Sequence, residues 1–132
     1  MLQFKKKESK DFYDIPGGKI EKNETSLETS IREFKEETGM DILSQTYKGN
    51  VIVEYPNRIF DFDIYIADKY SGKPKEFEEN NSAWVNIEEL FSKSKIYPSI
   101  EIIKYLKEDN INLIIYVDKN NKIIKVERKK LD

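Results

Sequence analysis

The clearest pattern of hydrophobic and polar positions in the chain lies between residues 25 and 39. Thr25 and Glu28 have the spacing of a helix capping box, and Gly39 stands where a helix C-terminal glycine belongs. Between them, apolar residues recur at positions i, i+4 and i+7, namely Leu27, Ile31 and Phe34. The pattern predicts one helix over residues 26–38 whose apolar stripe faces a core.

Shorter runs of apolar residues predict strands on both sides of this helix. Residues 46–55 and 58–68 form a predicted pair around a Pro56-Asn57 turn. In the second of these runs, apolar residues alternate with others from Phe60 to Ala67, which indicates a strand with two differently solvated faces. The other predicted elements in this part are short strands at 2–4 and 83–85 and polar loops at 5–11 and 71–82.

The last third of the chain predicts a helix followed by a hairpin. Pro98 and Ser99 open an amphipathic helix, after a short helical turn expected at 87–91. Asp118 to Asn121 give a strong hairpin signal between predicted strands at 113–117 and 122–127. No internal repeat or linker divides the chain, so we expect a single domain over residues 1–132.

Composition restricts the chemistry that this domain can perform. The chain has 132 residues, of which 38% are hydrophobic, and this suits about one domain with one sizeable core. It contains no histidine and no cysteine. Disulfides, Cys/His zinc sites, thiol nucleophiles and imidazole bases are therefore excluded. The chemistry must use carboxylates, amines or bound metal ions.

The charges are numerous but balanced. There are 23 Lys and Arg residues and 25 Asp and Glu residues, which gives a net charge of -2. No overall positive field recruits nucleic acid or an anionic membrane, so neither is an expected partner. No apolar run approaches the roughly 20 residues of a membrane span, and the first residues lack the apolar segment of a secretory signal. We therefore expect a cytoplasmic protein.

Three acidic residues are concentrated on one side of the predicted helix. Glu33, Glu36 and Glu37 have the spacing i, i+3, i+4, which places them in one sector roughly opposite the apolar stripe. Like charges at such spacing destabilise a helix, so they are either screened by solvent or neutralised by a cation. Upstream, the Pro16-Gly17-Gly18 turn has the backbone freedom to bring a carbonyl oxygen to these acids.

Residues 18–40 read GKIEKNETSLETSIREFKEETGM, and this segment resembles the Nudix box, G-x5-E-x7-R-E-U-x-E-E-x-G-U, in which U is a bulky apolar residue. Phe34 and Met40 stand at the two U positions. The fixed positions are all matched, by Gly18, Glu24, Arg32, Glu33, Glu36, Glu37 and Gly39. Seven fixed residues at set spacings rarely arise by chance in a chain of this length.

The resemblance implies a fold and an activity. The fold is α+β, a Nudix-type α/β/α sandwich with a mixed, mostly antiparallel sheet. Within the family, the chain is most similar to the MutT type and, more loosely, to the 8-oxo-dGTP diphosphatase branch. The implied activity is hydrolysis of the pyrophosphate bond in a nucleoside di- or triphosphate, with Mg²⁺ as cofactor and Mn²⁺ able to replace it.

The resemblance also implies roles for individual residues. The expected metal ligands are the Gly17 carbonyl and the carboxylates of Glu33, Glu36, Glu37 and Glu79, with Glu78 as the alternative to the last. Glu33 is the expected general base, or Glu79 if the metal ions engage the helix acids. Arg32 resembles the family arginine that orients the catalytic glutamate. Glu24 is expected to be structural or to support these ligands, and Lys19 either contacts a phosphate or is simply exposed.

The substrate is less closely defined by the residues. Phe12, Tyr13 and Asp14 precede the diglycine turn, where the resemblance places contacts to the base, and an aromatic there either stacks on a nucleobase, worth about 1–3 kcal/mol, or belongs to the core. The 8-oxo-dGTP diphosphatase branch has a tryptophan and paired aspartates shortly before its last helix. The matching stretch here, Tyr97 to Ile100, lacks the acid pair.

Several alternatives therefore stay open. ADP-ribose and dinucleoside polyphosphates are alternative substrates, and a 5'-triphosphate RNA end is the least supported because the chain has only three arginines and balanced charge. A Nudix-like nucleotide sensor without activity is a further alternative, against which the intact set of box glutamates argues. Both a monomer and a homodimer, formed through a free edge of the C-terminal hairpin, fit the sequence.

Overall fold

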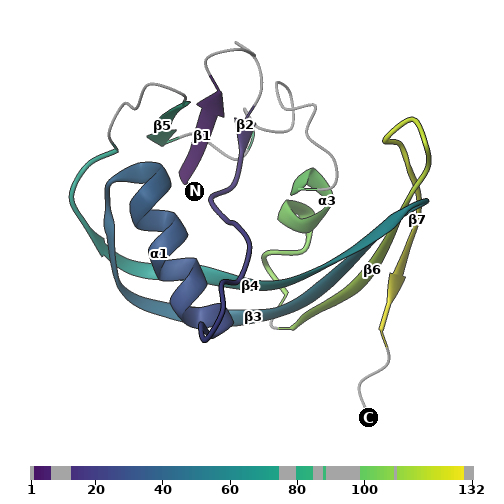
Figure 1. Ribbon diagram of the computed structural model, residues 1–132, viewed down its shortest axis with the longest axis horizontal. Helices are drawn as coiled ribbons and strands as arrows, with labels where there is room; N and C mark the ends of the chain where they lie inside the picture. Colours follow the sequence, from purple (N-terminus) through teal and green to yellow (C-terminus); the bar gives the residue numbers. More distant parts are fainter. Residues whose placement is uncertain are drawn as a thin grey trace. The chain divides into compact units, whose positions relative to one another are not determined.

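The computed structural model describes residues 2–6, 13–74, 80–84, 88, 99–108 and 110–129. In chain order the elements are β1 (Leu2–Lys6), β2 (Tyr13–Asp14), α1 (Ser26–Thr38), β3 (Asp41–Tyr55), β4 (Arg58–Ser71), β5 (Asn80–Trp84), α3 (Ser99–Lys104), β6 (Ile111–Val117) and β7 (Ile123–Arg128) (Figure 1).

The chain forms two compact units. The first comprises Met1–Thr46 and Ala67–Ile96, and the second comprises Tyr47–Ile66 and Tyr97–Asp132. We refer to them as the first and the second unit. The expectation of a single domain over residues 1–132 stays a prediction.

Helix α1 has the bounds that the sequence predicts, because both of its ends are fixed locally. At the start, Thr25 Oγ1 accepts a hydrogen bond from the Glu28 N–H at 3.1 Å, and the Glu28 carboxylate accepts one from the Thr25 N–H at 3.1 Å. At the end, Gly39 adopts a left-handed conformation with φ of 76°, which a residue without a Cβ reaches at little cost. The predicted capping box and glycine stop are confirmed.

The apolar stripe of α1 is buried only at its C-terminal end. Phe34 and Met40 form a buried cluster with Ile42 packed against it. Leu27 and Ile31, in contrast, are 43% and 39% exposed. The prediction that the whole stripe faces a core is wrong for these two residues, because the buried cluster lies where the helix ends and β3 begins.

The first unit contains a three-stranded antiparallel sheet in the order β2-β1-β5. Phe4 of β1 lies opposite Asp14 of β2, and Leu2 lies opposite Trp84 of β5. Strand β1 extends to Lys6, so the loop predicted from residue 5 begins later than expected. Strand β5 likewise begins at Asn80, inside the predicted polar loop. In both strands, pairing between distant segments extends the structure beyond the apolar residues.

The four-stranded sheet has the order β4-β3-β6-β7. Strands β3 and β4 are joined by the predicted two-residue turn, and both are longer than the sequence predicts. Strand β3 pairs in parallel with β6, where Val51 lies opposite Leu113, and β6 pairs antiparallel with β7. The predicted α+β class with a mixed, mostly antiparallel sheet is confirmed.

The core of the second unit is built mainly from β3 and β6. In β6, every second residue from Ile111 to Val117 is buried, which is the period of a strand with one face on a core. Helix α3 packs on these strands through Ile102 (Figure 1). In β4, only Ile64 joins the core, whereas Phe60 and Phe62 are exposed. The alternation predicted for β4 therefore does not produce a continuous buried face.

Gly49 permits the close approach of β3 and β6. Its φ is 137°, a conformation that residues with a side chain rarely adopt, and a Cβ at this position would overlap the backbone of Ile111.

Among the described residues, the longest helix is α1 with 13 residues, and no described helix is long and apolar enough to cross a membrane.

Candidate functional site

Arg32 lies at the centre of the polar cluster that the motif residues form in the first unit. Its side chain projects from α1, and all five N–H groups of its guanidinium donate hydrogen bonds. Nε and Nη2 bind the two carboxylate oxygens of Glu24 at 2.7 and 3.0 Å, and Nη2 also binds the Lys19 carbonyl at 3.2 Å. Such a bidentate, charge-assisted pair fixes the plane of the guanidinium as well as its position.

The other end of the guanidinium holds two of the predicted ligand carboxylates. Nη1 lies 2.8 Å from Glu33 Oε1 and 3.1 Å from Glu36 Oε2. The Glu33 side chain is largely buried and that of Glu36 is exposed. Arg32 therefore brings Glu24, Glu33 and Glu36 together, with one carboxylate on one side of the guanidinium and two on the other.

Glu24 is the most strongly held carboxylate of the cluster. Besides Arg32, its Oε1 accepts a hydrogen bond from Thr29 Oγ1 at 2.6 Å and one from the Glu21 N–H at 3.1 Å. Hydrogen bonds from Arg32 and then Thr29 lower the pKa of Glu24 from 4.5 to about 2. The same contact with Glu24, followed by that with Glu33, raises the pKa of Arg32. Both groups are thus charged at neutral pH.

The diglycine turn lies against the acidic side of α1. A Cβ on Gly18 would overlap the Glu33 carboxylate, so a side chain at this position would displace that carboxylate. The Gly17 N–H donates a hydrogen bond to Glu37 Oε2 at 2.9 Å. Gly17 thus contacts the acids through its N–H, whereas the expected role of its carbonyl as a metal ligand stays a prediction.

The residues of this cluster suit a hard divalent cation by their chemistry. Carboxylate and carbonyl oxygens are the protein ligands that Mg²⁺ and Mn²⁺ prefer. In the part of the chain that the structure describes, however, no three acidic side chains converge closely enough to hold a metal ion. Glu33 and Glu36 face Arg32, and Glu37 faces the Gly17 N–H. By its chemistry, the set of carboxylate oxygens beside the diglycine turn fits such an ion.

The remaining predicted site residues are placed less fully. Lys19 is exposed, and its backbone carbonyl contributes to the Arg32 cluster. Tyr13 and Asp14 form β2, which pairs with β1. Phe12, Glu78 and Glu79 lie outside the described residues, as do most of the helical turn expected at 87–91 and the stretch 91–98.

Thr29 is a member of this cluster that sequence reasoning missed. It is 4% exposed, which is unusual for a polar residue on a helix rich in charged side chains. Its position is one of the unspecified positions of the Nudix box, so the motif does not identify it. The available signal was its spacing of four residues from Thr25, which places its side chain above the first turn of the helix.

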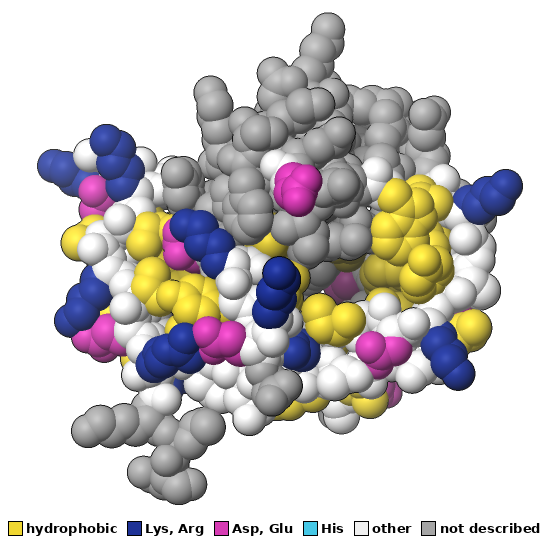
Figure 2. Space-filling model, turned by 180° about the vertical axis from the view of Figure 1, so that it is seen from behind, with side chains coloured by type: hydrophobic (Ala, Val, Ile, Leu, Met, Phe, Trp, Pro, Cys, Tyr) yellow, Lys and Arg dark blue, Asp and Glu magenta, His cyan; other side chains and the backbone are white. Residues whose placement is uncertain are grey.

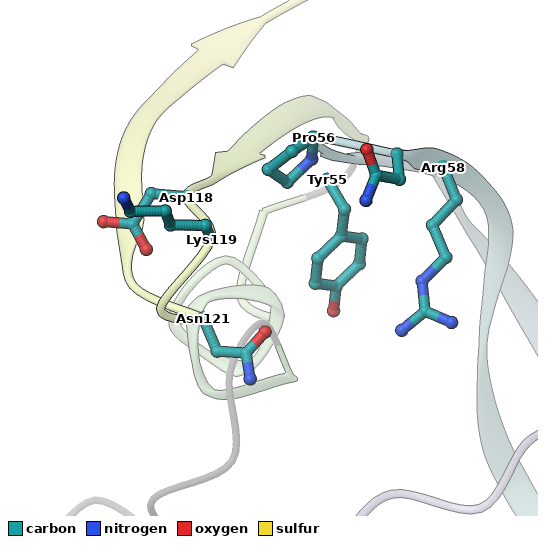
Figure 3. A pocket seen from close by; sticks show the side chains of 7 residues that line it. Tyr55, Pro56, Arg58, Asp118, Lys119 and Asn121 are labelled. Atoms are coloured by element: carbon teal, nitrogen blue, oxygen red, sulfur yellow. The ribbon is translucent and has the colours of Figure 1, made fainter.

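The second unit contains a separate hollow of about 340 Å³, which no sequence prediction names. It lies between the β3–β4 and β6–β7 turns, and the side chains of Tyr55, Arg58 and Asn121 point into it, whereas that of Lys119 points away (Figure 3). The Arg58 guanidinium lies 5.3 Å from the ring centre of Tyr55 and 5.1 Å from that of Phe60. These cation–π contacts hold the arginine against an aromatic surface.

On the face that Figure 2 shows, the described residues form no large area of one charge. Figure 2 shows Lys and Arg side chains interspersed with Asp and Glu side chains over the described part of the face turned to the viewer, with apolar groups between them. This distribution matches the balanced composition and offers no extended basic patch on that part for a nucleic acid.

Comparisons with known proteins agree with the motif. The model of the NUDIX domain family matches residues 1–106. The chain is 26% identical over 105 residues to the 8-oxo-dGTP diphosphatase of Buchnera aphidicola, an alignment that covers 80% of this chain and 85% of that protein. It is 32% identical over 81 residues to the 8-oxo-dGTP diphosphatase of Haemophilus influenzae, covering 59% of this chain and 60% of that protein.

The fold agrees with a solved structure of the same type. The MutT protein from Bacillus halodurans superposes with a TM-score of 0.83 at 21% sequence identity, covering 96% of this chain and 87% of that one. At this identity the likeness establishes the fold alone. Because the family model spans most of the chain and every fixed residue of the box is present, the chain belongs to the NUDIX domain family and is a Nudix hydrolase.

Proposed function

We propose that this Nudix hydrolase cleaves the pyrophosphate bond of a nucleoside di- or triphosphate, with oxidised purine nucleoside triphosphates such as 8-oxo-dGTP as the first candidates. The observation that carries the proposal is the Arg32 guanidinium, which holds Glu33 and Glu36 beside the diglycine turn. The two relatives named as 8-oxo-dGTP diphosphatases support the choice of substrate class.

The proposal includes a divalent metal ion, Mg²⁺ or in its place Mn²⁺. The residues that would hold it are Glu33, Glu36 and Glu37 on α1, the Gly17 carbonyl, and Glu79 from outside the described residues. When bound, such an ion neutralises the phosphate oxygens, polarises phosphorus and lowers the pKa of a coordinated water.

The chain's own residues then orient the reaction. Glu33 Oε1 accepts a hydrogen bond from Arg32 Nη1, which leaves Oε2 available to take the proton of the attacking water. Glu79 is the alternative base. Arg32 keeps the carboxylate in one orientation because its opposite edge is clamped by Glu24. In this proposal Lys19 contacts a phosphate, and Phe12, Tyr13 and Asp14 contact the base.

The substrate range is the open part of the proposal. The stretch 97–100 lacks the acid pair of the 8-oxo-dGTP diphosphatase branch. For this reason, other nucleotides should be tested beside the oxidised purines. ADP-ribose and dinucleoside polyphosphates are the alternatives within the enzymes, and a nucleotide sensor is the alternative without catalysis. A cytoplasmic location and the oligomeric state stay predictions.

A substrate panel tests the proposal directly. Purified protein is incubated with canonical and oxidised nucleoside triphosphates, ADP-ribose and diadenosine polyphosphates, each with Mg²⁺, with Mn²⁺ and with EDTA, and products are separated by ion-exchange chromatography. We expect release of pyrophosphate or phosphate from a nucleoside di- or triphosphate in the metal arms and none with EDTA. Turnover of ADP-ribose or a dinucleotide alone would replace the proposed substrate, and binding of nucleotides without turnover would favour the sensor.

A further inference from the structure

The hydroxyl of Thr29 makes a contact that the Nudix motif does not describe. Thr29 Oγ1 lies 2.6 Å from Glu24 Oε1 and 3.0 Å from the Thr25 carbonyl. A hydroxyl has one hydrogen to donate, and the carboxylate is both the closer and the charged acceptor. The Thr25 carbonyl already accepts the Thr29 N–H at 2.9 Å, so it does not depend on the hydroxyl.

This contact is the first link of a short chain of hydrogen bonds. Thr29 holds Glu24, Glu24 binds two N–H groups of Arg32, and the far side of Arg32 binds Glu33 at 2.8 Å. Thr29 and Glu24 are both largely shielded from water. Thr29 is 4% exposed, and the side chain of Glu24 is 14% exposed. Solvent therefore does not readily replace the hydroxyl.

The hydroxyl differs from the other donors to Glu24 in its rigidity. The Glu21 N–H belongs to an exposed turn before the helix, and Arg32 is itself the group to be held. Thr29 is β-branched and sits on the first turns of α1, so its side chain has few alternative rotamers. It therefore ties Glu24 to the helix carrying the predicted metal ligands independently of Arg32, which projects from the same helix.

We propose that Thr29 is a positioning residue for the Nudix reaction: its hydroxyl fixes the orientation of Glu24 and, through Arg32, that of the Glu33 carboxylate. The inference rests on the proposed function for its kinetic consequence, since Glu33 is there the general base. Its structural consequence, a more tightly held Arg32, does not depend on which substrate is cleaved.

The test compares variants that differ in this hydroxyl. Thr29→Val removes the hydroxyl with little change in side-chain shape. Thr29→Ala also removes it and introduces alanine, the residue with the highest helix propensity, whereas Thr29→Ser keeps the hydroxyl. Ser30→Ala is the matched control, because Ser30 lies on the same helix and its hydroxyl donates to the Leu27 carbonyl at 2.7 Å, away from Glu24. Thermal unfolding of each variant shows which of them fold.

Two readouts separate positioning from a purely structural role. The first is kcat and KM for the nucleotide that the parent cleaves fastest in the substrate panel, at saturating Mg²⁺. The second is hydrogen exchange of the Arg32 Nε–H, followed by NMR on ¹⁵N-arginine-labelled protein without metal. The chain has only three arginines, so Arg58→Lys and Arg128→Lys assign the signals, and those two arginines serve as internal references.

We expect Thr29→Val and Thr29→Ala to lower kcat by about tenfold with KM changed less than about twofold, and to accelerate exchange of the Arg32 Nε–H. Thr29→Ser should restore both, and Ser30→Ala should change neither. A folded variant without the hydroxyl that keeps the parental kcat and Arg32 exchange would overturn the inference. If the parent cleaves no nucleotide, the proposed function fails, and the exchange rates alone still decide whether Thr29 holds Arg32.

Discussion

At the scale of single residues, the motif identified the cluster but not how its members are held. The fixed positions of the box indicated Arg32 and Glu33, and the structure joins them at 2.8 Å. Thr29 was missed because its role depends on a contact with Glu24, five residues earlier in the sequence, and not on a residue type that a motif requires. The contacts to the base at residues 12–14 stay predictions, because no periodicity indicates which side chains face a ligand.

Glu37→Gln tests the predicted ligand role of the third helix acid. The substitution keeps the size of the side chain and an acceptor oxygen but removes the negative charge that would face the metal ion. We expect kcat for the cleaved nucleotide to fall by about 10²–10³-fold, the range seen when a group that stabilises transition-state charge is lost. The measurement is a steady-state assay over a range of Mg²⁺ concentrations.

Glu54→Gln is the control for this substitution. Glu54 is an exposed residue of β3 in the second unit, so the same change of charge should leave kcat within about twofold. If purified, folded Glu37→Gln turned over as fast as the parent, the ligand assignment would be wrong.

At the scale of elements, the sequence predicts what local interactions determine. The bounds of α1 were predictable because Thr25, Glu28 and Gly39 fix them within a few residues. The extension of β1 to Lys6 and the early start of β5 were not, because these two strands pair across most of the first unit's sequence. Likewise, the exposure of Leu27 depends on where the neighbouring segments lie and not on the helical period.

A comparison of substitutions at Gly49 and Gly72 tests whether β3 and β6 approach closely at Gly49. Both have positive φ, 137° and 94°, but only at Gly49 would a Cβ overlap a neighbouring backbone. We expect Gly49→Ala to lower the free energy of unfolding by more than Gly72→Ala, which should cost about 1–2 kcal/mol for its strained conformation. Urea denaturation of the two variants measures the difference, and equal losses would contradict the predicted overlap.

The β6–β7 turn makes a small, pH-dependent contribution to stability through Asp118. Its carboxylate accepts hydrogen bonds from the Lys122 and Asn120 N–H groups, at 2.9 and 2.8 Å, and these lower the pKa of Asp118 below 3.8. Because the pKa is lower in the folded state, the stabilisation is present above the unfolded pKa and is lost as the pH falls through the folded value.

Asp118→Asn tests this linkage, because the amide oxygen still accepts hydrogen bonds but does not titrate. We expect the difference in unfolding free energy between parent and variant to be constant at neutral pH and to shrink as the pH falls below about 3.8. Urea titrations from pH 7 to pH 2.5 measure it. A difference that stays constant over the whole range would show that the turn does not depend on the charge.

At the scale of the whole molecule, the family and the fold class were predictable from one motif and the order of elements. The family model and the MutT structure from Bacillus halodurans confirm both. The substrate was not predictable, because one fold can serve many substrates and the residues expected to contact the base, at positions 12–14, lie outside the box. The hollow beside Arg58 could not be predicted from the sequence either, because it forms between two turns that are far apart in the chain.

The stability of the second unit should depend on its buried aliphatic layer. Leu113 of β6 is fully buried in the main cluster, whereas Ile124 of β7 is 68% exposed. We expect Leu113→Ala to cost about 2–5 kcal/mol of unfolding free energy and Ile124→Ala to stay within about 0.5 kcal/mol of the parent. Denaturant unfolding followed by circular dichroism measures both, and comparable losses in the two variants would contradict the assignment of the core.

The parallel pairing of β3 with β6 has a consequence for synthesis on the ribosome. Strand β3 is complete at residue 55, but its partner β6 begins only at Ile111, so the growing chain carries Val51 and Val53 without their β6 neighbours while residues 56–110 are added. The β3–β4 hairpin can close early, whereas the sheet assembles only after the C-terminal segment has left the exit tunnel. Asp61 and Asp63 place negative charge along the β3–β4 hairpin before β6 has been made. This charge opposes association between the hairpins of nascent chains.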